Sequence, residues 1–524
     1  MTAEVLQEEW KPTHNPWITC IPLMVAAFMF VLDETIANVA LPYMAGSFSV
    51  SRQESTWILT SYLIASGIII PSVDFFSKLI GRKNFYILSI IVFTVSSFLC
   101  GIAVSLPMMV ITRILQGFGG GALLPLSQAM MLELFPVEKR AQSMAMFGLV
   151  VVIAPIIGPV IGGWITTNWS WPFIYFINIP IGIMAVYLAK ECIEDPPYAR
   201  KQTNVKIDAA GFFMLIGWLT CMQIVLDKGN DADWFGSTWV CWMSAFALIF
   251  AVIFFVIQAV KKDSLIDLKV FKDVNFFFGT LMQIVMHGVL LASLAILPQF
   301  LQGLMGYDAY LSGVAMMPRG IGALTTTIIV GVLGNKLNNK LLVTMGLILL
   351  SAAGFLLCSL NLEISTMDIA FPNFLMGIGL AMCMIPIITL STMTLTNEQM
   401  TNASGVQNLL KNLGGAVGTS IVTTIISRRA QVHQNFLVGN LAMTNDNFLE
   451  RMQAYSAAFQ SMTDKITADY MAQSMLYKQM LLQSNMGAFR DAFETCAIAC
   501  IVIIPMILFL KGIKKQKKKH KQVA

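Results

Sequence analysis

Two acidic residues, Asp33 and Glu34, lie deep inside an apolar run from Trp17 to about Met44. At ~1.5 Å of rise per residue, a helix of this length crosses a bilayer. A charge near the membrane centre costs at least ~2.5 kcal/mol on insertion scales, so it is normally kept to bind a proton, an ion or a charged solute. The alternative is a structural acid that pairs with a base elsewhere, and it applies most to Glu34, which can lie nearer the helix flank.

A cation, Arg113, occupies a comparable depth in another apolar run. It lies about 9 Å from the start of that run near Pro107, and Asp33 lies about 14 Å from Pro42, at the same rise per residue. These depths overlap within side-chain reach, which predicts an Arg113–Asp33 pair. In such a pair Arg113 would lower the proton affinity of Asp33, and cargo or a conformational change would break the contact.

The second half of the chain also places polar residues at depth. His287 could titrate near neutral pH or serve as a hydrogen-bonded filler. Lys411 forms a polar stripe with Asn408 and Asn412, which could equally hold helices together. The candidate residues for a substrate cavity are Asn38, Gln116, His287, Gln299, Arg319, Asn408 and Lys411.

The composition is that of an all-α polytopic membrane protein. Of 524 residues, 56% are hydrophobic and only 12% are charged, against ~25% charged residues in soluble proteins. The mean hydropathy is +0.71. The nine cysteines show no metal-ligand spacing and are interpreted as small core residues, so we expect neither a metal nor another cofactor. The first apolar run is expected to stay as a signal anchor, because no small-residue cleavage site ends it.

The hydropathy pattern predicts fourteen membrane helices. The segments lie at roughly 17–44, 54–76, 84–104, 107–133, 142–165, 171–190, 208–227, 238–260, 273–302, 309–334, 340–360, 368–396, 403–427 and 489–511. An even number puts both termini on one side. Loops after even-numbered helices carry lysines and arginines, seven lysines follow position 510, and the opposite short loops are nearly free of both. Both termini are therefore expected in the cytoplasm.

The chain contains an internal repeat. Gly117-Phe118-Gly119 recurs as Gly377-Ile378-Gly379, an offset of 260 positions, and a proline follows each motif. This predicts two six-helix bundles, at 17–190 and 273–511, joined by a linker region at 191–272 that holds helices 7 and 8. A cytoplasmic N-terminus at 1–16 and a basic cytoplasmic tail at 512–524 complete the organisation. Repeated halves are typical of transporters whose site lies at the membrane midplane.

One loop, at 428–489, is long and lies on the outer face. Ile466, Tyr470, Met475, Leu476 and Met480 recur at helical spacing within it, which predicts at least one amphipathic helix. We weigh two alternatives for this loop: a hairpin packed on the outer surface of the bundle, and a docking surface for a partner outside the membrane.

Several stretches in order carry a resemblance to a known family. They are Leu32 to Pro42 in helix 1, Arg113 to Gly119 in helix 4, Gly158 to Gly163 in helix 5, and Trp171 to Gly182 in helix 6. Together they resemble the fourteen-helix drug:proton antiporters of the major facilitator superfamily. Asp227-Lys228-Gly229 through Asp233-Trp234-Phe235, and the run 297–302, are similar to the EmrB-like branch.

The resemblance implies roles for particular residues. Asp33, Glu34 and Arg113 would couple transport to protons. Gly158, Pro159, Gly162 and Gly163 would form the antiporter motif at the interface of the two halves. The loop after helix 2 departs from the family pattern: Gly81, Arg82 and Lys83 are present, but Lys78 stands in the place of the usual acid. The conformational latch of that loop could instead use Asp74.

The resemblance further implies an exporter of amphipathic or hydrophobic toxic compounds that works by alternating access in a bacterial inner membrane. An EmrA-like periplasmic adaptor and a TolC-like outer-membrane channel would be its partners, and the lipid bilayer its surroundings. One alternative is a proton-coupled importer or metabolite transporter of the same fold. Another is a receptor or enzyme that transports nothing, although the sequence offers no nucleophile–base set and no phosphate loop.

Overall fold

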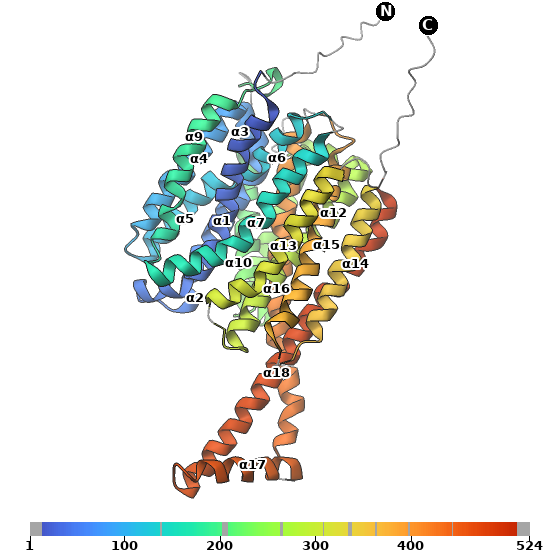
Figure 1. Cartoon of the computed structure of the whole chain (residues 1–524). Helices are drawn as coiled ribbons and strands as arrows, with labels where there is room; N and C mark the ends of the chain where they lie inside the picture. The colour runs from blue at the N-terminus through green and yellow to red at the C-terminus, as the bar shows by residue number, and fades with distance from the viewer. Residues whose placement is uncertain are drawn as a thin grey trace, which may run out of the picture.

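A computed structural model describes residues 13–136, 139–201, 208–261, 266–307, 309–333, 338–361, 364–396, 399–442 and 444–510. In these ranges fourteen helices are long and apolar enough to cross a membrane, as the sequence predicts. The basic tail at 512–524 and most of the N-terminal segment at 1–16 lie outside the described residues. The first turn of α1 and the last turn, η8, lie at the same end of the molecule, at the top of Figure 1. We call this end the terminal side.

The N-terminal bundle contains six spans. Its elements are α1 (Pro16–Phe48), α2 (Arg52–Ser55), α3 (Trp57–Ile80), α4 (Arg82–Gly101), α5 (Leu106–Gly120), α6 (Leu123–Glu133), α7 (Arg140–Asn168), α8 (Phe173–Phe176) and α9 (Asn178–Cys192). The chain starts α1 with Pro16 in the first turn, while the Asn15 side chain accepts a hydrogen bond from the Trp17 N–H at 3.0 Å. The fourth span consists of α5 and α6 together.

The linker region contributes two more spans. Its elements are η2 (Pro197–Ala199), α10 (Ala209–Lys228), η3 (Trp234–Gly236), α11 (Thr238–Val260) and η4 (Leu268–Lys272). Leu215, Trp218 and Leu219 of α10 belong to the same buried apolar cluster as α1 and α3. Most side chains of α11 are exposed on the protein surface, where a bilayer would cover them.

The C-terminal bundle repeats the arrangement of the first. Its elements are α12 (Val274–Gly303), α13 (Ala309–Leu333), α14 (Asn339–Cys358), α15 (Thr366–Thr392), α16 (Met400–Val438), η7 (Gly439–Leu441), α17 (Asp446–Phe459), α18 (Lys465–Ile503) and η8 (Ile504–Phe509). The pairs α1–α7, α3–α5 and α4–α5 pack in the first bundle, and their counterparts α12–α16, α13–α15 and α14–α15 pack in the second.

The repeated glycines explain this packing. A Cβ at Gly117 would lie 2.6 Å from the Tyr62 carbonyl oxygen on α3, and one at Gly377 would lie 1.9 Å from the Arg319 carbonyl oxygen on α13. These helices therefore approach each other backbone to backbone at equivalent points in both bundles.

The two bundles pack together near the terminal side. Gln128 of α6 accepts a hydrogen bond from Asn408 of α16 at 2.9 Å, and it contacts Gln407 at 3.5 Å. A Cβ at Gly405 of α16 would lie 3.1 Å from the Ile70 carbonyl oxygen of α3. On the other flank α7 packs along α13. Asn408 of the predicted polar stripe therefore lies between the bundles.

The segment predicted as a long loop at 428–489 is mostly helical. The span α16 continues to Val438, α18 begins at Lys465, and α17 crosses between them, so that a helical hairpin stands away from the bundles (Figure 1). The side of the molecule that carries it is called the hairpin side. Of the two alternatives for this segment, a hairpin packed on the surface of the bundle is excluded, because α16 and α18 continue as helices away from the bundles.

The amphipathic helix predicted within this segment is part of α18, but its buried face differs from the prediction. Leu476 and Met480 are buried, whereas Ile466 and Tyr470 are 71% and 68% exposed. The buried face of this part of α18 is formed by Ala468 and Ala472 instead. Small residues bring two helices close together, and an apolar pattern based on large side chains misses them.

Candidate functional site

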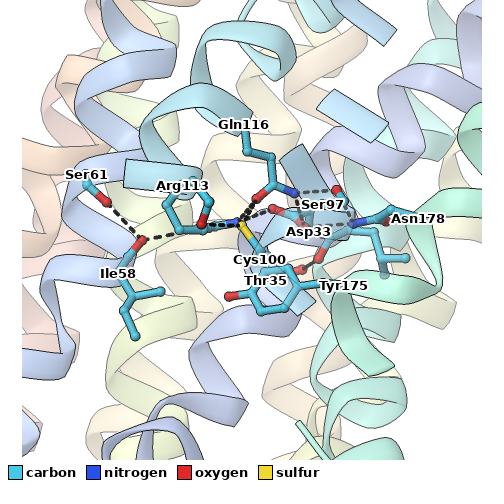
Figure 2. A network of polar contacts seen from close by, with 12 residues as sticks. Asp33, Thr35, Ile58, Ser61, Ser97, Cys100, Arg113, Gln116, Tyr175 and Asn178 are labelled. Carbon is cyan, nitrogen blue, oxygen red and sulfur yellow. Dashed lines mark hydrogen bonds and ion pairs between the residues drawn. The ribbon is translucent and has the colours of Figure 1, made fainter. Parts of the chain in front are cut away.

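Asp33 and Arg113 form a buried ion pair in the centre of the N-terminal bundle. Arg113 Nη1 lies 2.6 Å from Asp33 Oδ2, and both side chains are 0% exposed. Figure 2 shows the pair with its neighbours, which come from α3, α4, α8 and α9 as well as from α1 and α5 themselves. The expected pairing is therefore present in the structure. A buried pair of this kind is costly to break, because removal of one partner leaves an uncompensated charge worth about 3–5 kcal/mol.

Amide side chains complete the environment of Asp33. Gln116 Nε2 donates to Asp33 Oδ1 at 2.9 Å, and Asn178 Nδ2 donates to the same oxygen at 2.8 Å. Ser97 Oγ accepts from Gln116 at 2.7 Å and from Asn178 at 3.3 Å. Three donors therefore stabilise the ionised carboxylate. Gln116, a candidate cavity residue, belongs to this cluster. Asn178 and Ser97 were missed by sequence reasoning, although Asn178 lies within the helix 6 motif.

Arg113 is held by more than the carboxylate. Its Nε donates to the Ile58 carbonyl at 3.2 Å, its Nη1 donates to Gln116 Oε1 at 2.7 Å, and its guanidinium lies 4.0 Å from the centre of the Tyr62 ring. Arg113 Nη2 is buried and has no hydrogen-bond partner among the described residues. The guanidinium therefore has alternative contacts available if Asp33 becomes neutral.

The residue next to Asp33 faces a different environment. Glu34 is partly exposed and lines a cavity of about 230 Å³ between α3, α10, α12 and α16. Within the described part of the chain it makes no hydrogen bond or ion pair. Asp227 of α10 lines the same cavity, together with Gln223 and Asn412, and leucines supply much of the remaining wall. An apolar wall with a few polar groups is typical of small-molecule sites.

The hairpin-side end of α10 connects the two bundles beside this cavity. Thr60 of α3 donates to Asp227 Oδ2 at 2.5 Å, and Lys228 donates to Thr56. Toward α16, Asn230 donates to Ser427 at 3.0 Å and Trp234 donates to Thr424 at 3.1 Å. We call residues 227–234 the α10 strap. It coincides with the motif that is similar to the EmrB-like branch.

The other candidate cavity residues lie outside the lining of the 230 Å³ cavity. Asn38 and Gln299 are exposed on α1 and α12, and His287 is partly buried beside Gly415 of α16. Lys411 is buried, and its Nζ donates to Asn408 at 2.8 Å. Arg319 is buried and lines a separate gap between α7, α12 and α15.

The glycines of the helix 5 motif lie against α1. A Cβ at Gly158 would lie 2.3 Å from Thr35 Oγ1, and one at Gly162 would lie 2.7 Å from Ile36 Cγ1. A Cβ at Gly163 would meet Val39 at an ordinary 3.9 Å. Pro159 lies inside the helix, and Val160 faces Gly313 of α13. Helix α7 thus lies between the bundles, but its tightest glycine contacts join it to the segment that carries Asp33 and Glu34.

The loop after α3 forms ion pairs that differ from the expected latch. Arg82 is paired with Glu133 of α6 at 2.8 Å, with both side chains nearly fully buried. Asp74 instead pairs with Lys78, one turn away on α3, at 2.5 Å. Gly81 adopts φ +90°, which suits glycine, and the Lys83 N–H donates to Asp195 at 2.9 Å. Glu133, which the predicted latch does not include, is the carboxylate that pairs with Arg82.

The sequence matches the family model described as Major Facilitator Superfamily over residues 23–419. The chain is 32% identical to the fatty acid resistance protein FarB of Neisseria gonorrhoeae, over 94% of this chain and 96% of that protein. It is also 32% identical to the multidrug export protein EmrB of Escherichia coli strain K12, over 94% and 95%. The colistin resistance protein EmrB of Acinetobacter baumannii is 30% identical, over 97% and 99%.

Solved structures share the fold at low sequence identity. The crystal structure of the human organic anion transporter MFSD10 superposes with a TM-score of 0.62 at 11% identity, over 94% of this chain and 100% of that one. A bacterial homologue of the human lysosomal transporter Spinster gives a TM-score of 0.54 at 14% identity, over 93% and 95%. With a family model that covers most of its length and relatives aligned nearly end to end, this chain belongs to the major facilitator superfamily.

Proposed function

We propose that this protein is a proton-driven multidrug exporter in which Asp33 binds the coupling proton. The observation that carries the proposal is the fully buried Asp33–Arg113 pair, surrounded by three neutral polar side chains. A buried ion pair contributes little net stability compared with apolar packing of the same volume. Its retention in a membrane helix therefore favours a functional role.

Protonation would act by changing the partners of Arg113. A proton that arrives at an Asp33 oxygen neutralises the carboxylate and removes the charge that holds Arg113 Nη1. The guanidinium then keeps Gln116, the Ile58 carbonyl and the Tyr62 ring. A shift of α1 would reach α7 through the contact between Thr35 and Gly158, and from there α13 through Val160 and Gly313. This path links the proton site to the interface between the bundles.

The direction of transport and the class of cargo rest on the relatives. Their names refer to export of multiple drugs and to resistance to fatty acids and to colistin. We therefore propose outward movement of amphipathic or hydrophobic toxic compounds, with the cavity beside Glu34 as a place where cargo binds. Proton-coupled import by the same fold is the second candidate, and a direction-resolved assay separates the two.

We further propose a bacterial inner membrane as the location and a periplasmic adaptor as partner of the hairpin. The hairpin, from about Arg428 to Phe489, stands clear of the bundles and exposes Phe436 and Ile466 at 77% and 71%. An outer-membrane channel would complete the export path. The cycle would need no cofactor, because the proton gradient supplies the free energy.

The proposal is tested with purified protein in proteoliposomes under an imposed pH gradient. Drug-induced proton release and drug movement are measured for the wild-type protein, Asp33→Asn and Glu34→Gln. We expect Asp33→Asn to bind drug but to lose the link between drug and proton movement. Glu34→Gln changes the neighbouring acid, which lies outside the ion pair and lines the proposed cargo cavity. We expect it to alter drug binding and to keep the proton release per drug moved.

Two outcomes would contradict the proposal. Normal proton-linked transport by Asp33→Asn would make Asp33 structural. Drug movement by the wild-type protein that does not depend on the pH gradient would show that transport is not coupled to protons. Because Asp33→Asn leaves Arg113 without its counter-ion, the thermal stability of each variant is measured in parallel, and the double variant Asp33→Asn/Arg113→Gln separates lost coupling from misfolding.

A further inference from the structure

The C-terminal bundle contains a buried cluster at the positions that correspond to the proton site. Arg319 of α13 donates through Nη1 to Ser293 Oγ at 3.1 Å and through Nη2 to Asn373 Oδ1 at 2.9 Å. Ser293 and Asn373 each stand 260 positions after Asp33 and Arg113 respectively (293 − 33 and 373 − 113), which is the offset of the internal repeat. The cluster therefore contains the repeat counterparts of Asp33 and Arg113, with serine in place of the acid and asparagine in place of the arginine, while its cation, Arg319, comes from α13.

With neutral side chains at both of these positions, the cluster gives Arg319 no negative partner. Its side chain is 1% exposed, and no acidic side chain pairs with it in the ranges that the structure describes. Three hydrogen bonds, one each from Nε, Nη1 and Nη2, leave two of its five N–H donors without a bond among the described residues. A buried guanidinium surrounded by neutral groups carries a desolvation cost that a bound anion would offset.

The gap beside Arg319 lies between helices of the two bundles, so alternating access would change its size. Arg319 lines a gap of about 10 Å³ with Val151 and Pro155 of α7, Leu290 and Leu294 of α12, and Leu380 and Met384 of α15. The gap holds about one water molecule in this state. Because α7 belongs to the N-terminal bundle and the other helices to the C-terminal one, separation of the bundles along this flank would widen the gap. Every other lining residue is apolar.

We propose that Arg319 is a binding site for the carboxylate of an amphipathic anion, whose apolar part packs on the surrounding leucines. The inference rests on the proposed transport function and adds a class of cargo to it. The guanidinium fork matches a carboxylate in two-point geometry, and a charge-assisted hydrogen bond is stronger than a neutral one. Cargo of this class would enter the gap when α7 and α13 separate and would leave when they close.

The test uses two probes with the same chain and different headgroups. Binding of dodecanoate and of dodecyltrimethylammonium, below their micellar concentrations, is measured on the full-length protein in nanodiscs. We expect Arg319→Gln to weaken dodecanoate binding by at least about tenfold, the equivalent of one charge-assisted contact, and to leave dodecyltrimethylammonium unchanged. Arg319→Lys, which keeps the charge but not the fork, should retain part of the dodecanoate affinity.

A second variant distinguishes loss of anion binding from loss of folding. Asn373→Asp would give Arg319 an internal carboxylate at the position of its present 2.9 Å contact. We expect this variant to be at least as heat-stable as the wild type and yet to lose dodecanoate binding, because the guanidinium is already neutralised. A purely structural role for Arg319 would leave the headgroup preference unchanged in Asn373→Asp.

The proposal is overturned if Arg319→Gln weakens both probes equally or if Asn373→Asp binds dodecanoate as the wild type does. These failures differ from failure of the proposed function. Proton-linked drug transport by the wild-type protein can persist while the headgroup preference is independent of Arg319. Absence of proton-linked transport in the wild type would instead contradict the proposed transport function, on which this inference rests.

Discussion

Asp33 and Ser293 occupy equivalent positions in the two repeated bundles, and each forms a hydrogen bond with a buried arginine. In the first bundle the partner is a titratable acid, and in the second it is a hydroxyl that carries no charge. The arginines themselves are not equivalent, because the position that corresponds to Arg113 holds Asn373 and Arg319 comes from α13. The pseudo-symmetric halves have thus diverged into a charged pair in one and an uncompensated cation in the other. This asymmetry places the proposed proton site in the first bundle and the proposed anion site in the second.

We expect Arg113→Lys to alter the pH dependence of transport without abolishing it. Lysine keeps the charge beside Asp33, but it cannot reproduce the contacts of the guanidinium with Gln116 and the Ile58 carbonyl. The pH profile of drug uptake into inverted vesicles should therefore shift, whereas drug binding at fixed pH should change little. An unchanged profile would contradict the role assigned to Arg113.

The helix 5 glycines offer a matched pair of substitutions. Gly158→Ala should reduce transport strongly, because its Cβ would lie 2.3 Å from Thr35 Oγ1 and push α7 away from α1. Gly163→Ala should leave transport nearly unchanged, since its Cβ would meet Val39 at 3.9 Å. Transport rates at equal expression measure the difference. Equal effects of both substitutions would mean that the α1–α7 contact is not what limits the cycle.

The α10 strap should remain with the N-terminal bundle and release the C-terminal one during the cycle. Its hydrogen bonds to α3 involve the charged groups of Asp227 and Lys228, whereas its hydrogen bonds to α16 join neutral side chains. The ion pair between Asp233 and Arg428 of α16, at 3.8 Å, is solvent-exposed and therefore weak. Asp233 and Trp234 also adopt positive φ angles of 55° and 51°, an uncommon backbone conformation that is kept where surrounding contacts enforce it.

Crosslinking with a short thiol-reactive bridge tests the strap. The pair Asn230→Cys/Ser427→Cys, which joins α10 to α16, should lose transport when bridged and recover it on cleavage of the bridge. The pair Thr60→Cys/Asp227→Cys, which joins α10 to α3, should show no additional loss when bridged. Variants with only one of the two introduced cysteines serve as controls for the native cysteines, of which Cys241 is exposed. The reverse pattern would show that α10 moves with the C-terminal bundle.

Asp208, just before α10, should make the stability of the inserted helices depend on pH. Burial alone would raise the pKa of Asp208, but hydrogen bonds from Lys261, the Gly211 N–H and Gln258 hold the pKa of this carboxyl below its usual range. A depressed pKa contributes stability that is present above the unfolded-state value, about 3.9, and is lost as pH falls through the folded-state value.

Thermal unfolding of wild type and Asp208→Asn in detergent checks this expectation. The variant should melt at a lower temperature near pH 7, and the difference should shrink below about pH 4, where the carboxyl gains a proton first in the unfolded state and then, at lower pH, in the folded state. A difference in melting temperature that stays constant across this range would contradict the electrostatic explanation.

The sequence predicts the features that depend on hydropathy and depth. Fourteen spans follow from the lengths of the apolar runs, and the Asp33–Arg113 pair follows from two charges at similar depth. The partners that complete the site depend on how each helix is rotated about its axis, which hydropathy does not fix. Asn178 and Ser97 were missed for this reason, and so was Glu133, the actual partner of Arg82.

The hairpin shows a different limit of prediction from hydropathy. Its residues are polar, so hydropathy predicts a loop there. They nevertheless favour the helical conformation, and α16 and α18 therefore continue as helices beyond the length needed to cross a bilayer. At ~1.5 Å per residue, the 39 residues of α18 span about 58 Å, nearly twice the ~30 Å hydrocarbon core.

Because α18 is one uninterrupted helix, its distal half cannot remain still while its membrane half turns. A small rotation of the C-terminal bundle becomes a larger sideways displacement at α17, in proportion to the distance from the rotation axis. A salt bridge from Arg429 and a hydrogen bond with His433, both to Asp491, hold the base of the hairpin together, so both of its arms move together. A protein bound at the tip would therefore sense each transport cycle mechanically, without any contact with cargo or proton.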